Sequence, residues 1–461
     1  MIISCVMKYF LGYFILNLLR FSMFKSASEY VGALKQITSN KTLLGQRKEI
    51  YSDILSESIP FISAMSAPEL RSFSKSVLII HSRFGLNLNN YLLKAIDRRI
   101  IDFIGSGSSP ENRHALVGSM SHLSQVIRQR HDGGPPALRP DNVWKFVHQP
   151  QWRPLWLEPN ISCVMDKCEL LTILSRLSIR PFDAVFSDIF FPKSDVELFR
   201  TGDDRTRING RICGAINSMA KLRKSENHIF DDFLHLVPSR IHELSNFELG
   251  NIAHASATSL VVNDNLSDCE FKIQLVVTIL RRLCRDKRQL SAATVNQIAL
   301  TGLALEYLPE RPVMSDEIKV FLRTCLEASC SDSTNMITVS KAQSVIRKAF
   351  DQLGLGEMVL EEFAVGPFRI DFCVAKLKLL IEINGPYHYY YKSTLRTART
   401  EFKHRMLTKM GFLVIDIDFL EMKDQDDRVA LLEKKLRDAL GLVHSRPGRL
   451  KSDILKLVNS V

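Results

Sequence analysis

The chain has 461 residues, of which 46% are hydrophobic and 24% are charged, and its formal net charge is +11. This composition excludes disorder of the whole chain, because so many apolar residues can bury a core, and the length indicates about two to four domains. The excess of 61 Lys and Arg over 50 Asp and Glu favours a polyanionic partner, either nucleic acid or an anionic membrane surface.

Residues 1–28 have the composition of an organelle-targeting segment. They combine basic residues, serines and large apolar side chains without a single acid, since the first acidic residue is Glu29. This pattern is typical of a mitochondrial presequence, and a signal-peptide core that opens a two-part address to a plastid is the alternative. The apolar run from Tyr9 to Leu19 is shorter than the roughly 20 residues of a membrane span, so no stable membrane insertion is expected. Met7 and Met23 are alternative starts beside Met1.

The nine cysteines are odd in number and scattered through apolar runs. This usage indicates small buried side chains in a reducing compartment rather than a disulfide framework. No pair has Cys-x-x-Cys spacing or nearby histidine partners, so structural zinc is not expected. We therefore expect no resident cofactor.

Two helical regions and a connector precede residue 331. Residues 30–135 follow a helical period, residues 136–160 are rich in Pro and Trp, and residues 161–330 are again helical. The three tryptophans Trp144, Trp152 and Trp156 are expected to dock the connector onto a core, with base stacking as the alternative.

A weak repeat runs through the second helical region. The segment that starts at Leu244 resembles the segment that starts at Leu290, and in each a serine, Ser245 or Ser291, precedes a helical run. Ser66 precedes a third such run. Serine at this place caps a helix, and its recurrence predicts stacked helix pairs, an all-α solenoid-like repeat region. An irregular bundle with ordinary caps is the alternative.

The densest basic run of this region lies at residues 281–288. Arg281, Arg285 and Arg288 share one face of the expected helix at spacings of four and three. This stripe is interpreted either as a solvated face or as a phosphate-binding surface for RNA.

After residue 333 the pattern changes to mixed helices and strands. An amphipathic helix at residues 340–353 is followed by strands at 358–364, 368–374 and 377–383, a helix at 397–410, a strand at 412–417 and a helix at 428–440. The order αβββαβα predicts a compact α/β domain over residues 340–441, followed by a basic tail at 442–461. Gly354 and Gly411 are expected to end helices, and Gly385 to permit the backbone angles of a turn.

Spaced motifs in this domain resemble a RAP domain. They are Ile370–Phe372, Leu379–His388, Thr400, Lys403, Arg405, Leu407, Gly411 and a last strand ending in Phe419 and Glu421. RAP domains of apicomplexan parasites, algal organelles and animal FAST-kinase-domain proteins typically follow helical repeats. The resemblance implies an α+β multidomain protein with a restriction-endonuclease-like RAP domain, which acts on RNA in mitochondria or in a plastid such as the apicoplast.

The nuclease-like fold raises the question of catalysis. Asp371 and Glu382 lie on neighbouring expected strands and can meet at one edge of the sheet, where two carboxylates can hold Mg²⁺. The position two residues after Glu382, where such nucleases carry a lysine, is Asn384. Fixing of the sheet edge through Lys403 or Arg405, or RNA contact, is therefore preferred to hydrolysis, and the two acids stay candidate catalytic and metal residues only if the protein is a nuclease.

A loop rich in aromatic and basic residues follows the same strand. Rings and cations side by side suit single-stranded RNA, since cations contact phosphates and flat rings stack on bases, although a solvated helix face is the alternative. At least two of the rings are expected to pack into the core. The candidate RNA-binding residues here are Tyr387, His388, Tyr389, Lys392, Arg396, Arg399, Lys403 and Arg405.

Three functional hypotheses result. The preferred one is a non-enzymatic mitochondrial RNA-binding protein that acts on organellar transcripts or rRNA, in RNA stability, processing or ribosome assembly. The second is a Mg²⁺-dependent endoribonuclease that uses Asp371 and Glu382, and the third is a scaffold that binds protein partners.

Overall fold

We describe the chain from a computed structural model. The residues described are 24, 26–39, 48–84, 88, 90–106, 109–126, 139–148, 152–157, 160–190, 193–201, 205–263, 268–286, 290–331, 340–424, 427–442 and 449–460. The expected targeting segment lies almost wholly outside these residues, and Arg288 lies outside them. The chain divides into two compact units, Met1–Ala215 and Ile216–Val461, and each is described by itself.

The first unit is helical throughout its described part. Its helices are α2 (Ala27–Ser39), α3 (Lys48–Glu57), α4 (Ile59–Ile62), α5 (Ala67–Phe84), α6 (Asn90–Ser106), α7 (Pro110–Gln125), α8 (Pro140–His148), α9 (Arg153–Trp156), α10 (Ile161–Arg176), α11 (Asp183–Ile189) and α12 (Lys193–Thr201), and α13 (Arg205–Lys221) runs on into the second unit.

The Pro/Trp-rich connector supplies core residues to this unit. Trp152 and Trp156 are fully buried and pack edge-on against Phe146 of α8. The indole of Trp152 donates a hydrogen bond of 3.1 Å to the carbonyl of Ile104. Docking, rather than base stacking, is therefore confirmed for these two tryptophans, whereas Trp144 is half-buried and stacks on His148.

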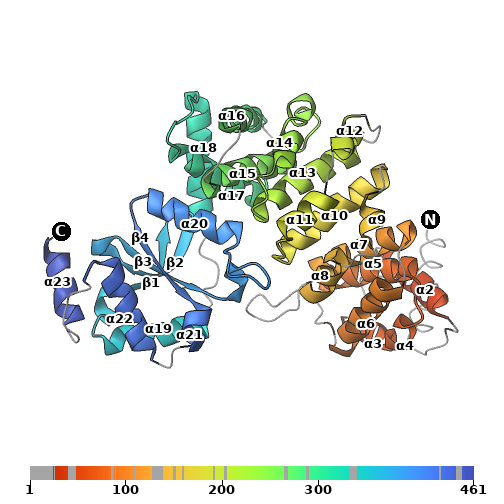
Figure 1. Ribbon diagram of the computed structural model, residues 1–461, viewed down its shortest axis with the longest axis horizontal. Helices are drawn as coiled ribbons and strands as arrows, with labels where there is room; N and C mark the ends of the chain where they lie inside the picture. Colours follow the sequence, from red (N-terminus) through yellow and green to blue (C-terminus); the bar gives the residue numbers. More distant parts are fainter. Residues whose placement is uncertain are drawn as a thin grey trace, which may run out of the picture. The chain divides into compact units, whose positions relative to one another are not determined.

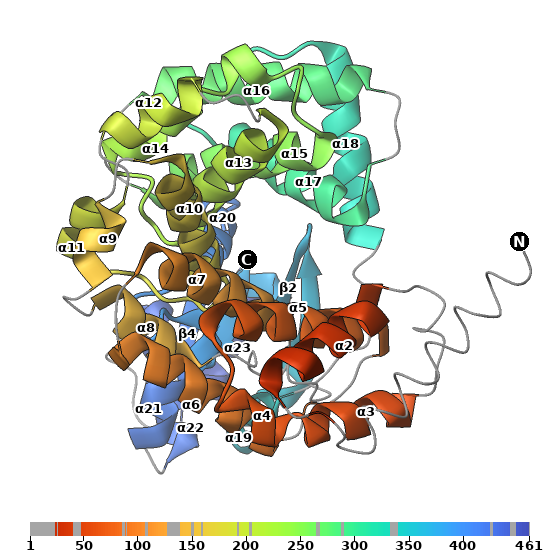
Figure 2. The ribbon, with the colours of Figure 1, turned by 90° about the vertical axis from the view of Figure 1, so that its right-hand side faces the viewer.

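Helix pairs open the second unit. The helices after α13 are α14 (His228–Leu234), α15 (Asn246–Val262), α16 (Cys269–Arg285), α17 (Ala292–Glu306) and α18 (Asp316–Ser331). α15 packs on α16 and on α17, and α17 on α18, so that α15–α16 and α17–α18 form two stacked pairs (Figure 2). Ser245 makes a full capping box with Glu248, and Ser291 accepts from the backbone amide of Thr294. The predicted helical repeat is confirmed here.

The C-terminal part of this unit is a four-stranded mixed sheet with helices on both faces (Figure 1). Strands β1, β2 and β3 pair antiparallel, and β4 pairs parallel with β3. The predicted order of helices and strands is confirmed, apart from two additional helices, at Phe419–Asp424 and Leu450–Ser460, that the sequence did not predict. The elements are α19 (Lys341–Gln352), β1 (Leu360–Val365), β2 (Phe368–Val374), β3 (Leu379–Asn384), α20 (Ala398–Lys409), β4 (Leu413–Asp418), α21 (Phe419–Asp424), α22 (Arg428–Ala439) and α23 (Leu450–Ser460).

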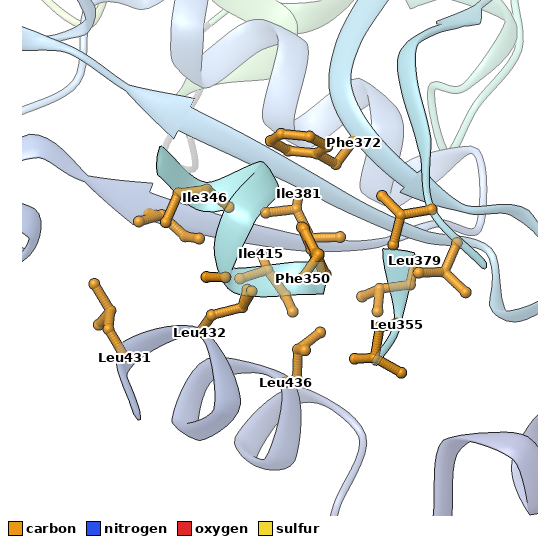
Figure 3. Close-up of a cluster of buried hydrophobic side chains, with 14 of the residues drawn as sticks. Ile346, Phe350, Leu355, Phe372, Leu379, Ile381, Ile415, Leu431, Leu432 and Leu436 are labelled. Carbon is orange, nitrogen blue, oxygen red and sulfur yellow. The ribbon is translucent and has the colours of Figure 1, made fainter. Parts of the chain in front are cut away.

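Each face of the sheet has its own hydrophobic core. On one face, Phe372, Ile381 and Ile415 pack against α19 and α22 (Figure 3). On the other face, Ile370 and Leu380 pack against α20 and also against apolar side chains of α15 and α17. All six residues of β3 are buried, as its continuous apolar run predicts. The α/β module and the last helix pairs therefore share a core.

Two glycines end helices as expected. Gly354 and Gly411 have positive φ angles of 69° and 86°, a conformation that costs other residues free energy. The amide of Phe412, after Gly411, donates to the carbonyl of Leu407 at 3.1 Å, which closes α20.

Two local expectations are wrong. Gly385 has φ −71° and ψ 175°, an extended conformation that any residue adopts, so the turn does not depend on glycine. The last strand does not include Phe419 and Glu421, because β4 ends at Asp418 and α21 begins at Phe419. The carboxylate of Glu421 accepts the amide of Asp418 at 3.1 Å and so satisfies a backbone donor where the helix starts.

No helix in the described ranges is long and apolar enough to cross a membrane. The eight cysteines among the described residues carry free thiols. Within the same residues, no group of three or more His, Cys, Asp or Glu side chains is arranged to hold a metal ion.

Candidate nucleic-acid interface

Polar residues line the end of the sheet where β3 and β4 stop. Glu382 of β3 lies beside Asp416 of β4, and Asn384 lies beside Asp418. Because side chains alternate along a strand, these four face the same side as Leu380, toward α20. Three carboxylates and an amide are thus gathered on the face that α20 and the loop before it cover.

Asp371 joins this group from β2. The antiparallel register pairs Phe372 with Ile381, which puts Asp371 opposite Glu382. The two oxygens of Asp371 accept hydrogen bonds of 2.6 Å, one from the side-chain amide of Gln343 and one from the backbone amide of Ile383. Burial raises the pKa of Asp371 above its usual value. The structure therefore brings the two candidate catalytic acids together, with Asp371 already bound to protein donors.

Glu382 forms an ion pair with a lysine from α20. Its carboxylate is only 8% exposed and lies 2.7 Å from Nζ of Lys403, which also donates to the carbonyl of Arg369 at 2.5 Å. Burial raises the pKa of Glu382 to about 7, although the charge of Lys403 acts in the opposite direction. Lys403 thus links Glu382 of β3 to the start of β2.

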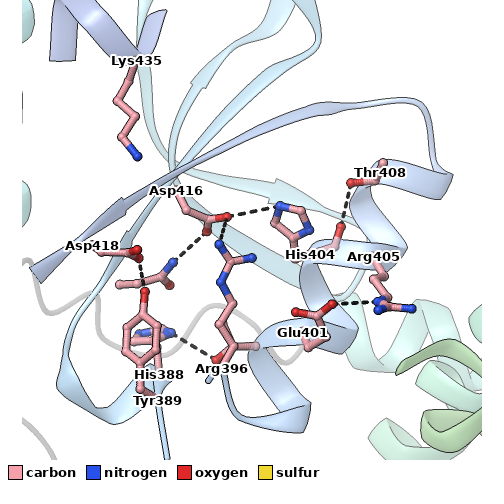
Figure 4. Close-up of polar contacts among 12 residues, drawn as sticks. His388, Tyr389, Arg396, Glu401, His404, Arg405, Thr408, Asp416, Asp418 and Lys435 are labelled. Atoms are coloured by element: carbon pink, nitrogen blue, oxygen red, sulfur yellow. Dashed lines mark hydrogen bonds and ion pairs between the residues drawn. The ribbon is translucent and has the colours of Figure 1, made fainter. Parts of the chain in front are cut away.

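Asp416 is the centre of a second polar cluster (Figure 4). It accepts contacts from Arg396 at 2.8 Å, from His404 at 3.2 Å and from the side-chain amide of Asn384 at 2.7 Å. Burial opposes its ionisation, but the hydrogen bond from His404 and the charge of Arg396 outweigh burial and lower its pKa. The side-chain amide of Asn384 therefore orients Asp416.

The aromatic loop splits into buried and exposed rings. Tyr389 and Tyr390 are buried; the hydroxyl of Tyr389 donates to Asp418, and that of Tyr390 donates to the carbonyl of Lys221 at 2.6 Å. The expectation that at least two rings pack into the core is confirmed. Tyr387 is 71% exposed, and His388 is half-buried with a pKa lowered by burial and by the charges of Lys403 and Arg399.

The basic side chains of the predicted RNA-binding set also divide into exposed and half-buried ones. Lys392 and Arg399 are exposed, and Lys392 lies 5.3 Å from the ring centre of Tyr391. Arg405 is half-buried and bonds to Glu401 at 2.7 Å and to the carbonyl of Val261 at 3.3 Å. The predicted set therefore separates into side chains that hold the module together and side chains that face solvent. On α16, Arg281 and Arg285 are both exposed, as a stripe on one face requires.

A cleft of about 760 Å³ lies within the second unit, between the helix pairs and the α/β module. Its walls come from α13, α15 and α17 on one side and from the sheet end, the aromatic loop and α20 on the other. The lining residues that the sequence did not single out include Lys221, His254, Asn296, Gln297 and Arg369. They come from α13, α15, α17 and β2, so no single local motif marks them.

One of the histidines that line this cleft, His254, lies near two positive charges. Burial, followed by the charges of Lys221 and Arg399, lowers the pKa of His254 to about 4. Its ring meets Phe402 of α20 edge-on at 5.8 Å. His254 is therefore neutral near pH 7, beside the positive charges of Lys221 and Arg399.

Residues 381–435 match the family model of the RAP domain. The chain carries a C-terminal RAP domain. The match starts in β3 and ends in α22, so it covers Glu382, the aromatic loop, α20 and Asp416. RAP domains are generally associated with RNA binding, and here the RAP domain stands behind helical repeats. No curated protein sequence matches the chain significantly.

Proposed function

We propose that the chain is an organellar RNA-binding protein in which the RAP domain and the last helix pairs contact single-stranded RNA together. The observation that carries the proposal is the cleft between them, at which Lys221 and Arg399 meet the aromatic loop that bears Tyr387. Cations that neutralise phosphates beside a ring that can stack on a base are what unpaired RNA requires.

The exposed arginines of α16 are proposed as additional RNA contacts in the helical repeats. Arg281 and Arg285 belong to the same unit as the RAP domain and lie one helical turn apart on a solvent-facing surface. They offer further phosphate contacts to a strand longer than the cleft can hold. The proposed role is in RNA stability, processing or ribosome assembly. The proposed location is the mitochondrion, with a plastid as the alternative, because residues 1–28 contain no acidic residue.

RNA binding is favoured over hydrolysis by the state of the two acids. Both oxygens of Asp371 accept protein hydrogen bonds, and Glu382 is ion-paired with Lys403. Carboxylates with raised pKa values and protein donors in place are a poor fit for Mg²⁺, which needs ionised oxygen ligands in an octahedral arrangement. We therefore derive no catalytic step through a metal.

The test uses the full chain and a fluorescein-labelled 15-nucleotide oligo(U) RNA, with fluorescence anisotropy at several salt concentrations. We expect affinity to fall with salt, because each neutralised phosphate contributes about −0.7 to the slope on a logarithmic scale. Arg399→Gln should weaken binding about threefold to tenfold, as loss of one phosphate contact does. Lys376→Gln is the matched control, since Lys376 is an exposed cation at the opposite end of β3.

The same samples separate the alternatives. Cleavage of the RNA with Mg²⁺ that is lost in Glu382→Gln would favour the endoribonuclease. A lack of salt-sensitive RNA binding would favour the protein scaffold.

A further inference from the structure

A second cavity lies wholly within the first unit, among α5, α7, α10 and α13. α7 packs against both α5 and α10, and Figure 2 shows α5 and α7 side by side. The cavity has a volume of about 240 Å³. The basic side chains in its wall are Arg71, His114, His122, Arg207 and Arg211.

The two carboxylates in this wall already have cationic partners. Asp166 is held by buried Arg113 at 3.2 Å and by His114 at 2.7 Å. Glu169 is ion-paired with Arg211 and accepts the hydroxyl of Ser121. Once these pairs are made, Arg71 adds a positive charge that the carboxylates of the wall do not balance.

A glycine places one of these arginines. Gly118 of α7 lies directly under the side chain of Arg71, so closely that a Cβ atom built there would be 2.8 Å from Arg71 Cδ and closer still to Nε. Any larger residue at this position pushes the arginine away. Arg71 makes no ion pair with the acidic residues of the described part of the chain. The guanidinium of Arg71 therefore lies at the cavity, where it can bind a negatively charged ligand.

His122 gives an independent sign of the local field. Burial, then the charges of Arg71 and Lys75, lowers the pKa of His122 to about 4. The imidazole is therefore neutral near pH 7, because a further positive charge is unfavourable there. The imidazole also makes a hydrogen bond with the backbone of Arg71, which acts in the opposite direction on its pKa.

We propose that this cavity binds a phosphate group. Planar guanidinium groups match the oxygens of phosphate in charge and in hydrogen-bond geometry. A volume below the roughly 300 Å³ of pockets for drug-sized ligands suits a single phosphate rather than a whole bulky molecule. The phosphate belongs either to an RNA chain or to a small phosphorylated molecule. The inference does not rest on RNA binding, because the second source can be tested without RNA.

Two variants of the full chain test the site. Arg71→Gln removes the charge, and Gly118→Ala displaces the arginine without changing any charge. Alanine also favours a helix by about 1 kcal/mol over glycine, so the second variant is not expected to lose the fold. The matched controls are Arg83→Gln, an exposed arginine on the same helix α5, and Gly105→Ala, a helical glycine with nothing within 4 Å of its Cβ position.

Two probes distinguish the sources. Inorganic phosphate at millimolar concentration is followed by the melting temperature, and the labelled oligo(U) RNA is followed by anisotropy. For a free phosphate ligand, phosphate raises the melting temperature of the wild type and of both controls, and this rise is at least halved in Arg71→Gln and Gly118→Ala. For RNA, both variants lower the affinity threefold to tenfold and reduce the salt slope by about 0.7.

Either result supports the phosphate site, and the phosphate arm stands even if the chain binds no RNA. The proposal is overturned if both variants match their controls in both assays.

Discussion

Oδ1 of Asn251 accepts a 2.7 Å hydrogen bond from Nε2 of Gln297, and these two residues hold the same position in consecutive helical repeats, 46 residues apart. Asn251 is buried on α15 and also donates to the carbonyl of Phe247. Next to it, Gly250 leaves so little space that a Cβ atom would come within 2.9 Å of Thr294 on α17. The repeats are thus joined by equivalent residues of their first helices.

The first prediction concerns this joint. Asn251→Ala leaves the half-buried amide of Gln297 without this acceptor, so we expect the free energy of unfolding to fall by about 1–3 kcal/mol in urea denaturation. Ser329→Ala is the control, because it removes an exposed side-chain hydrogen bond to Asn296 that joins α18 to α17 within one helix pair. Equal stability of the two variants would show that the bond between Asn251 and Gln297 stabilises the fold no more than an exposed hydrogen bond does.

What the sequence predicts well is local. Three features depend on spacings within a few residues, and all are found. They are the serine caps before α15 and α17, the helix ends at Gly354 and Gly411, and the order of the four strands and the main helices along the RAP domain. Such features are encoded by backbone hydrogen bonding and by alternation of apolar residues.

What the sequence does not predict is tertiary. The cleft residues Lys221, His254 and Arg369 come from elements more than 100 residues apart in places, and nothing in their own neighbourhoods marks them. The ion pair of Lys403 with Glu382 is expected from the sequence and is present. Arg396 is different, because its positive charge looks like part of a solvent-facing stripe until β4 pairs with β3 and supplies Asp416. Only the parallel register of those two strands puts the acids within reach.

The second prediction uses the raised pKa of Glu382. In the folded chain this carboxyl keeps its proton up to about pH 7, whereas in the unfolded chain it loses the proton near its ordinary pKa. Between these two pKa values the folded chain therefore binds more protons than the unfolded chain. The contribution of Glu382 to the free energy of unfolding, at most about 3 kcal/mol, is lost as the pH rises through that range.

Glu382→Gln isolates this contribution, because glutamine keeps the shape of the side chain and does not titrate. We expect the loss of unfolding free energy between pH 5 and pH 8 to be smaller in the variant than in the wild type, as measured by urea denaturation. Glu357→Gln, an exposed glutamate of the same domain, serves as control. A variant whose stability follows pH as the wild type does would contradict the buried, proton-binding state of Glu382.

The third prediction compares two glycines of the RAP domain. Gly411 adopts φ 86° at the end of α20, so Gly411→Ala should cost about 1 kcal/mol of unfolding free energy. Gly385 is extended and has nothing within 4 Å of its Cβ position, so Gly385→Ala should leave stability unchanged or slightly raised. Chemical denaturation of both variants measures the difference, and a larger loss at Gly385 would contradict the turn geometry.

The fourth prediction concerns the exposed ring of the aromatic loop. Tyr387 has 71% of its surface exposed and lines the cleft, whereas its neighbours Tyr389 and Tyr390 are buried. A ring that large is free to stack on a base, which contributes about 1–3 kcal/mol to single-strand binding. Tyr387→Ala should therefore weaken binding of the labelled oligo(U) RNA by roughly fivefold to a hundredfold, while the melting temperature stays the same.

Tyr387→Phe separates stacking from hydrogen bonding, because it keeps the ring and removes only the hydroxyl. We expect this variant to bind RNA as the wild type does. Tyr390→Phe is expected to behave in the opposite way, since its hydroxyl bonds to the carbonyl of Lys221 and accepts the amide of Ala398. It should lower stability by about 1 kcal/mol, because buried backbone groups lose their partner. Loss of RNA affinity in Tyr387→Phe would mean that the hydroxyl, and not the stacked ring, makes the contact.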